Sequence, residues 1–228
     1  MCAVLLATLA RRDRVRLPLT LAMISLGIAF VMALGMLASP QGTQGAIFSG
    51  MYVIDPFSQV FKVLILLVAM AVVCLWLLFS RANTPNQDVP DYLCLLLGAT
   101  LGMLMMVSAS NLLMIFLALE SASLPSYVLA GFRKRSRVAS EGSLKYVIFG
   151  SAASAVTLYG MSLIYGTTGH LQLAHIATVI AAEGISPLMA VGLLSLMAGI
   201  GFKLAAVPMH FWTPDVFQGS PVEVATLL

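Results

Sequence analysis

Residues 92–131 read YLCLLLGATLGMLMMVSASNLLMIFLALESASLPSYVLAG, a stretch of 40 residues whose one charged side chain is Glu120. As a single α-helix it would be about 60 Å long, twice the roughly 30 Å thickness of the hydrocarbon core of a bilayer. It must therefore fold back on itself, and we expect the turn at the polar residues 108–111. The stretch predicts two consecutive transmembrane helices, at about 92–109 and 111–131.

The composition of the whole chain agrees with a membrane protein. Of the 228 residues, 60% are hydrophobic and 9% are charged, against about 25% charged residues in a soluble domain. Further apolar segments lie at about 17–38, 57–79 and 142–166, and an interrupted one lies at about 186–217. We therefore expect an all-α, polytopic bundle of transmembrane helices that forms a single domain over residues 1–228.

Lysine and arginine alternate between the loops that connect these spans. Every second loop contains Lys or Arg, and such a loop is called cationic below; the loops between them contain neither residue. The cationic loops are 11–16, 81–91 and 132–141. The loops without Lys or Arg are 39–56, 109–111 and 167–185. By the positive-inside rule the cationic loops face the cytoplasm. Because a wrong number of spans would scramble this alternation, the pattern supports the predicted spans.

Several other classes of protein are excluded. The net charge is only +3, without the basic stripe typical of nucleic-acid binding, so no nucleic-acid partner is expected. Cys2, Cys74 and Cys94 are widely separated and are interpreted as small buried apolar residues. His170 and His175, in the loop 167–185, have no third ligand nearby and make a poor metal site. No nucleotide-binding or nucleophile motif occurs, so we expect no metal and no bound cofactor in this chain.

Both ends of the sequence fall inside expected spans. The stretch of about nine apolar residues before Arg11 is too short to cross a bilayer, and its arginines follow it instead of preceding it as in a signal sequence. At the other end, a new apolar segment begins after Pro221. We therefore expect the sequence to be a fragment of a longer polytopic protein, incomplete at both ends.

Three charged residues inside the expected spans are candidates for function: Glu120, Lys203 and Lys145. A charge near the middle of a span costs roughly 2.5–3.5 kcal/mol on insertion scales, so it usually marks an ion path or a polar protein interior. Glu120 and Lys203 lie well inside their spans and are the best candidates. The alternative for each is a structural charge tied to a neighbouring helix. Lys62, about a turn and a half from its helix start, is expected at the membrane interface.

Lys145 and one histidine, His210, could also take part in proton transfer. Lys145 lies a few residues inside its span and four positions after Glu141, the favourable spacing for an ion pair along a helix. A snorkelling lysine is therefore nearly as good an interpretation as a functional one. His210 lies seven residues after Lys203, nearly on the same face if the helix continues, and histidine can exchange a proton near neutral pH. A hydrogen-bonded structural histidine explains it equally well.

Each of the two best candidates is followed five positions later by a proline, Glu120 by Pro125 and Lys203 by Pro208. Proline offers no N–H to the carbonyl four residues before it, and an unpaired carbonyl in a membrane must face protein or water. We therefore expect a kink and local hydration beside each charge, with an ordinary transmembrane proline kink as the alternative. Further prolines and a glycine predict that the span 186–217 is discontinuous.

Three stretches of the sequence resemble one protein family. They are residues 119–125 (LESASLP), 144–154 (LKYVIFGSAAS) and 201–221 (GFKLAAVPMHFWTPDVFQGSP). They closely resemble the subunit N family of proton-pumping NADH-quinone oxidoreductase, respiratory complex I, and the resemblance covers nearly the whole chain. Related antiporter-like subunits, including those of Mrp-type sodium/proton antiporters, usually have Leu-Pro-Asp where this chain has WTPD at 212–215.

The resemblance implies a membrane-arm subunit of the bacterial cytoplasmic (inner) membrane, with an antiporter-like repeat that contains a discontinuous helix. In this family the residues matching Glu120 and Lys203 form a pair whose contact changes during pumping. The residue matching Lys145 belongs to the same polar axis, and His210 would extend it. Protons would be moved, quinone would be involved only indirectly, and FMN and iron–sulfur clusters would belong to partner subunits. An Mrp-type sodium/proton antiporter subunit and a scaffold that only holds partners are the alternatives.

Overall fold

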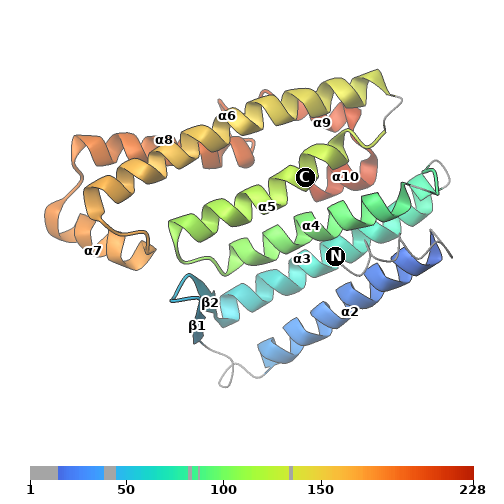
Figure 1. Ribbon diagram of the computed structural model, residues 1–228, viewed down its shortest axis with the longest axis horizontal. Coiled ribbons are helices and arrows are strands. Elements are labelled where there is room, and N and C mark those ends of the chain that lie inside the picture. The colour runs from blue at the N-terminus through green and yellow to red at the C-terminus, as the bar shows by residue number, and fades with distance from the viewer. Residues whose placement is uncertain (1–14, 39–44, 82–83, 87, 134–135) are drawn as a thin grey trace.

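The computed structural model describes residues 15–38, 45–81, 84–86, 88–133 and 136–228. Over these residues the chain is a bundle of helices that run side by side, with a small β-hairpin at one end (Figure 1). Five of the helices in these ranges are long and apolar enough to cross a membrane. The predicted fold class, a polytopic bundle of transmembrane helices, is confirmed.

The membrane-spanning helices agree with the predicted segments. They are α2 (Arg16–Ala38), α3 (Pro56–Leu75, continued by the π-helix η2, Trp76–Ser80), α4 (Val89–Val107), α5 (Leu112–Ala130) and α6 (Arg137–Thr168). The shorter helices are α7 (Leu173–Glu183), α8 (Pro187–Lys203), α9 (Thr213–Gly219) and α10 (Val222–Leu227). The hairpin consists of β1 (Gly45–Ile47) and β2 (Tyr52–Ile54) in antiparallel pairing.

The start of α3 follows directly from its sequence. The Asp55 carboxylate accepts a hydrogen bond from the Ser58 N–H at 2.8 Å, and the Asp55 N–H donates to the Ser58 hydroxyl at 3.2 Å. Pro56, which has no N–H to satisfy, occupies the first helical position. This reciprocal capping box fixes the point at which the chain enters the bundle after the hairpin.

The predicted turn at 108–111 is confirmed, because α4 ends before it and α5 begins after it. The side-chain oxygen of Asn111 caps α5 by accepting the Leu113 N–H at 2.9 Å. The turn also contacts the hairpin, where the Gly50 carbonyl accepts hydrogen bonds from the Ser110 hydroxyl and the Gln172 side chain. Gly50 adopts a φ of 82°, a left-handed conformation that suits glycine.

One stretch expected as a loop is partly helical. Residues 167–185 contain α7, so the expectation of a plain loop there is wrong. The α7 sequence LAHIATVIAAE is mainly apolar, and its Ile176 packs with Leu112 and Met161 in a buried cluster. The eleven residues span only about 17 Å, too little to cross a bilayer. The missed signal was the apolar periodicity of this short segment.

The two ends of the bundle differ in charge. The hairpin, the turn at 108–111 and α7 lie at one end, here called the hairpin end (Figure 1). The opposite end, here called the arginine end, carries the four cationic loop residues that the structure describes. These are Arg16, Arg81, Arg133 and Arg137. The other cationic loop residues, Arg11, Arg12, Arg14, Lys134 and Arg135, lie outside the described residues. The predicted alternation of charge is therefore confirmed for the described loops.

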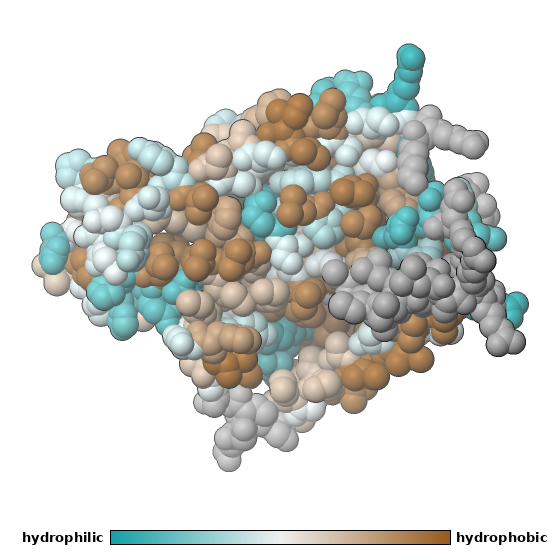
Figure 2. All heavy atoms as spheres, in the orientation of Figure 1, coloured by the Kyte–Doolittle hydropathy of each residue, from teal (hydrophilic) through white to brown (hydrophobic). Residues whose placement is uncertain are grey.

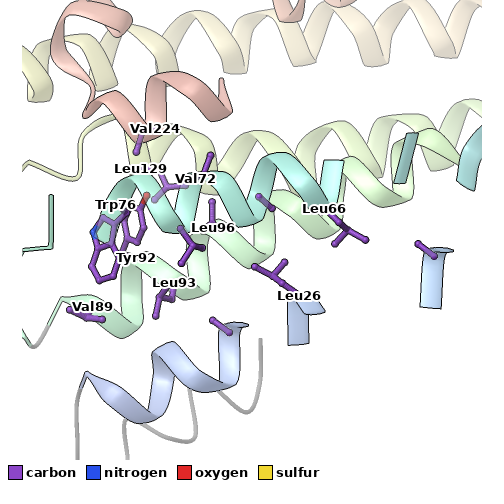
Figure 3. Close-up of a cluster of buried hydrophobic side chains, with 14 residues drawn as sticks. Leu26, Leu66, Val72, Trp76, Val89, Tyr92, Leu93, Leu96, Leu129 and Val224 are labelled. Atoms are coloured by element: carbon purple, nitrogen blue, oxygen red, sulfur yellow. The ribbon is translucent and has the colours of Figure 1, made fainter. Parts of the chain in front are cut away.

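Helices α2 to α5 and α10 share a buried apolar cluster. In it Trp76 stacks on Tyr92, with ring centroids 5.2 Å apart, next to Leu96, Leu129 and Val224 (Figure 3). Large apolar side chains also cover much of the outer surface (Figure 2). An apolar exterior is what a bundle surrounded by lipid requires.

The expected span at 186–217 is broken, as the sequence predicts. Helix α8 ends at Lys203, and turns occupy residues 204–212 before α9 begins. The break folds back onto α8, because the Trp212 indole N–H donates to the Phe202 carbonyl at 3.1 Å. The Phe202 carbonyl lies in the last turn of α8, where carbonyl groups have no N–H partner within the helix. By contrast, α5 continues through Pro125 to Ala130.

Candidate functional site

Glu120 and Lys203 face each other inside the bundle. Glu120 lies in the middle of α5 and Lys203 is the last residue of α8, and both helices pack against α6. The Lys203 Nζ atom lies 4.0 Å from Glu120 Oε1, at the outer limit of an ion pair. The Lys203 side chain is 14% exposed and the Glu120 side chain 24%. The structure thus brings together the two residues that the sequence singles out.

Each charged group also has neutral hydroxyl partners. The Lys203 ammonium donates to the Ser123 hydroxyl at 2.5 Å and to the Tyr127 hydroxyl at 2.9 Å. The Glu120 carboxylate accepts a hydrogen bond from the Ser154 hydroxyl at 2.5 Å. Ser123 and Tyr127 follow Glu120 by three and seven positions on α5, so they share its helical face. Sequence reasoning named the two charges but missed all three hydroxyls.

Small residues give this polar cluster its room. Gly150 of α6 lies directly against the Tyr127 ring and hydroxyl, where any side chain would collide. Ser154, one turn later, donates to Glu120. Gly199 of α8 lies in the same way against Thr157 of α6. Gly150 and Ser154 therefore allow α5 and α6 to pack closely and also line the charged pair.

The helix break places Lys203 where a cation is favoured. The carbonyl end of a helix carries a partial negative charge, which stabilises a nearby positive charge. Lys203 lies in the last turn of α8. The break at 204–212 thus places an interrupted backbone next to Lys203. The sequence predicts a kink beside this lysine from Pro208. The structure records the ammonium within reach of both its carboxylate and its hydroxyl partners.

Lys145 forms a separate cluster nearer the arginine end. Its ammonium lies 2.8 Å from Glu141 Oε1, as the spacing on α6 predicts, and 2.6 Å from Asp215 Oδ2. The Lys145 side chain is 38% exposed, so it is only partly buried. Asp215 of α9 was not predicted as a partner. The contact joins α9 to α6, and Gly142 allows the two backbones to approach closely there.

His210 does not join either cluster. The helix ends at Lys203, so the argument that His210 shares its helical face is wrong. The histidine is exposed within the break at 204–212. Its carbonyl accepts the Thr213 N–H, and its ring makes no hydrogen bond or ion pair with the residues that the structure describes.

The remaining histidines and cysteines in the described part of the chain form no group that could hold a metal ion. His170 and His175 lie with their rings 5.1 Å apart, His175 on α7. No group of three or more His, Cys, Asp or Glu that could hold a metal ion occurs within the described ranges. Cys74 is exposed and Cys94 is half-buried, so the interpretation of these cysteines as buried residues is wrong. Cys2 lies outside the described residues.

Two further charged residues are deeply buried. Lys62 of α3 is 9% exposed, so it is enclosed by neighbouring helices, and its expected depth at the membrane interface stays a prediction. Its ammonium lies 4.9 Å from the centre of the Tyr52 ring. Glu223 of α10 is 1% exposed, and its Oε2 has no hydrogen-bond partner among the described residues. Sequence reasoning passed over Glu223, although an acidic residue within the last apolar segment was a visible signal.

Comparison with known proteins identifies the family of this chain. Residues 109–228, slightly more than half of the chain, match the family described as NADH:quinone oxidoreductase/Mrp antiporter, TM. The chain belongs to this family. The matched region contains both charged clusters, that of Glu120 and Lys203 and that of Lys145 and Asp215.

Curated relatives of the chain are subunits of one enzyme. NADH-quinone oxidoreductase subunit N of Rubrobacter xylanophilus is 40% identical over 200 residues, which are 88% of this chain and 40% of the relative. Subunit N of Parvibaculum lavamentivorans is 46% identical over 177 residues, 78% of this chain and 36% of the relative. The chain thus spans about two fifths of the length of these curated relatives.

Solved structures of membrane complexes contain similar chains. A chain of respiratory complex I from Thermus thermophilus superimposes with a TM-score of 0.73 at 38% identity, covering 90% of this chain and 43% of that one. A chain of the Mrp complex from Dietzia sp. DQ12-45-1b gives a TM-score of 0.80 at 24% identity, covering 99% and 42%. The second likeness shows the shared fold alone. Both structures are multi-subunit membrane assemblies.

Proposed function

We propose that this chain is part of a proton-translocating membrane-arm subunit of an NADH-quinone oxidoreductase, in the cytoplasmic membrane of a bacterium. The observation that carries the proposal is the Glu120–Lys203 pair, held at 4.0 Å inside a transmembrane bundle next to a broken helix. Intramembrane charges of this kind mark proton and ion paths. The similarity to subunit N at about 40% identity supports the choice of complex.

The charged pair would work by changing its separation. In contact with the Glu120 carboxylate, the Lys203 ammonium is stabilised and keeps its proton. When the two groups part in a site largely closed to water, the charge on Lys203 loses its compensation and the proton passes to a neighbouring water molecule. The recorded separation, with hydroxyl partners on both groups, is compatible with motion in either direction.

Lys145 and His210 would extend the path towards the arginine end. Lys145, bound by Glu141 and Asp215, can exchange protons between the α6 surface and the break. His210 lies within that break and is accessible. The chain would supply one antiporter-like repeat, next to other membrane-arm subunits. NADH oxidation, FMN, the iron–sulfur clusters and quinone reduction would belong to partner subunits, so that quinone is coupled to this chain only indirectly.

The replacement Lys203→Ala in the full-length subunit of the assembled complex tests the proposal. In membrane vesicles we expect proton pumping and coupled quinone reduction to fall at least fivefold, because the exchangeable amine is lost. NADH oxidation by an artificial acceptor should be retained, since it does not pass through the membrane arm. Leu194→Ala, at an exposed position on the same helix, is the matched control and should pump normally. Normal pumping by Lys203→Ala would refute the proposal.

Purification separates this function from that of a sodium/proton antiporter subunit. We expect the full-length subunit to copurify with flavin- and iron–sulfur-containing subunits and to pump at equal rates with and without sodium. Sodium-dependent proton exchange by an assembly without those subunits would favour the antiporter, whose family description this chain shares.

A further inference from the structure

Lys62 is a buried cation outside the pair described above. It lies six residues after the first residue of α3, about 9 Å along the helix from the hairpin end. Helix α3 packs against α2, α4 and α10, whereas Glu120 and Lys203 lie among α5, α6 and α8. A lysine in a membrane span normally reaches its polar surroundings by snorkelling. At 9% exposure, most of the Lys62 side chain is instead enclosed by the bundle.

The ammonium of Lys62 lacks the partners that a buried cation needs. It lies over the Tyr52 ring, but it makes no hydrogen bond or ion pair with any residue in the described ranges. A lysine ammonium has three N–H donors, and a ring face satisfies none of them as a hydrogen bond. The nearest acidic residue in sequence, Asp55, uses its carboxylate to cap α3 through the Ser58 N–H.

Two further buried polar groups near Lys62 are also unpaired. The Gln59 side-chain nitrogen, one turn earlier on the same face of α3, has no partner among the described residues. The same holds for the Ser108 hydroxyl at the end of α4. Ser108 is close to Tyr52, because its carbonyl accepts the N–H of Val53 at 2.8 Å. Gln59 and Ser108 are both almost completely buried.

Unpaired donors and acceptors that gather in a buried place are normally joined by internal water. Here the Lys62 ammonium lies over the Tyr52 ring, the Gln59 amide lies one turn before Lys62 on α3, and the Ser108 carbonyl binds the residue that follows Tyr52. Together they can supply the two to four polar partners that a buried water molecule requires. No carboxylate within ion-pair distance fixes the charge of Lys62 among the described residues. The geometry therefore favours an exchangeable proton over a permanent ion pair.

We propose that Lys62 is a further proton-exchanging lysine of this chain, in addition to Lys203 and Lys145, and that it is hydrated by internal water that Gln59 and Ser108 hold at the hairpin end. In the exchange step, one N–H bond of the ammonium breaks and the proton passes to the hydrogen-bonded water. The electron pair stays on the nitrogen, and the reverse step recharges the amine. The proposal rests on the proton-translocating function proposed above.

The replacement Lys62→Arg in the full-length subunit of the assembled complex separates proton exchange from a purely structural role. Arginine keeps the charge and stacks on aromatic rings, but it does not give up its proton in proteins. We therefore expect at least a fivefold loss of proton pumping in membrane vesicles, with assembly unchanged on a native gel. A Lys62→Arg enzyme that pumps at the normal rate would overturn the proposal, because a fixed charge would then suffice.

A second variant covers the case in which arginine prevents assembly. Ser108→Ala removes one water-binding hydroxyl and leaves Lys62 and the Tyr52 ring in place, so we expect pumping to fall two- to fivefold. Normal pumping by an assembled Ser108→Ala enzyme would contradict the hydrated site. Leu64→Ala, on the exposed side of α3, is the control. Lys203→Ala in the same assay separates the two proposals, because a loss there without a loss at Lys62 rejects only the present one.

Discussion

At the scale of single residues, the Lys203 ammonium is shared between a charged partner and two neutral ones. Its hydrogen bonds to Ser123 and Tyr127 are shorter than its 4.0 Å separation from Glu120. The hydroxyls therefore stabilise the lysine at a distance from the carboxylate. The hydroxyls and the carboxylate compete for the Lys203 ammonium, and this competition sets how easily Lys203 and Glu120 come into contact. A mutation of a hydroxyl alters the competition without removing either charge.

Replacing Tyr127 by Phe should shift this balance towards contact between Glu120 and Lys203. The ring that packs against Gly150 is kept, and only the hydroxyl that accepts from Lys203 is lost. A hydrogen bond to a charged group is worth about 1.5–3 kcal/mol, so a severalfold fall in pumping rate is expected, with normal assembly. Vesicle pumping assays measure it, with Tyr159→Phe at an exposed position of α6 as the control. Equal rates in the two variants would show that the hydroxyl has no part in pumping.

At the scale of helices, the sequence predicts what depends on local composition. The apolar segments, the turn at 108–111 and the discontinuity of the span 186–217 were all predicted correctly. The position of the break was not, because it begins directly after Lys203 and α9 is helical through Pro214. The partners of the charges were not, because Ser154 and Asp215 lie far along the chain from Glu120 and Lys145. Contacts between distant helices leave no periodic signal. Helix α7 does have a local signal, but it was missed because its apolar segment is too short to span a membrane.

Close packing of α5 on α6 makes Gly150 a sensitive position. A methyl group there would collide with Tyr127, whereas one at Gly166 on the same helix meets no atom within 4 Å. Overpacking costs about 1–3 kcal/mol, and alanine otherwise favours a helix over glycine by up to about 1 kcal/mol. Gly150→Ala should therefore lower the unfolding temperature of the purified subunit, and Gly166→Ala should leave it unchanged or raise it. Equal stability of the two variants would contradict the packing described here.

At the scale of the whole molecule, the segregation of charge gives the bundle a direction. The described loop arginines lie at one end, and Lys62 lies near the other. Glu120 and Lys203 lie between them, inside the bundle. If the arginine end faces the cytoplasm, the two lysines lie at successive depths across the membrane, with Lys62 nearer the outer side. The orientation therefore decides which compartment the proposed hydrated site serves.

Cysteine labelling tests this orientation directly. Ser49, in the hairpin, and Ser140, near the start of α6, are both exposed and lie at opposite ends. In a subunit whose native cysteines are replaced, Ser49→Cys should react with a membrane-impermeant maleimide in spheroplasts from which the outer barriers have been removed. Ser140→Cys should react only after the membrane is opened, because the positive-inside rule places the arginine end in the cytoplasm. The reverse pattern would turn the bundle over and place Lys62 next to the cytoplasmic supply of protons.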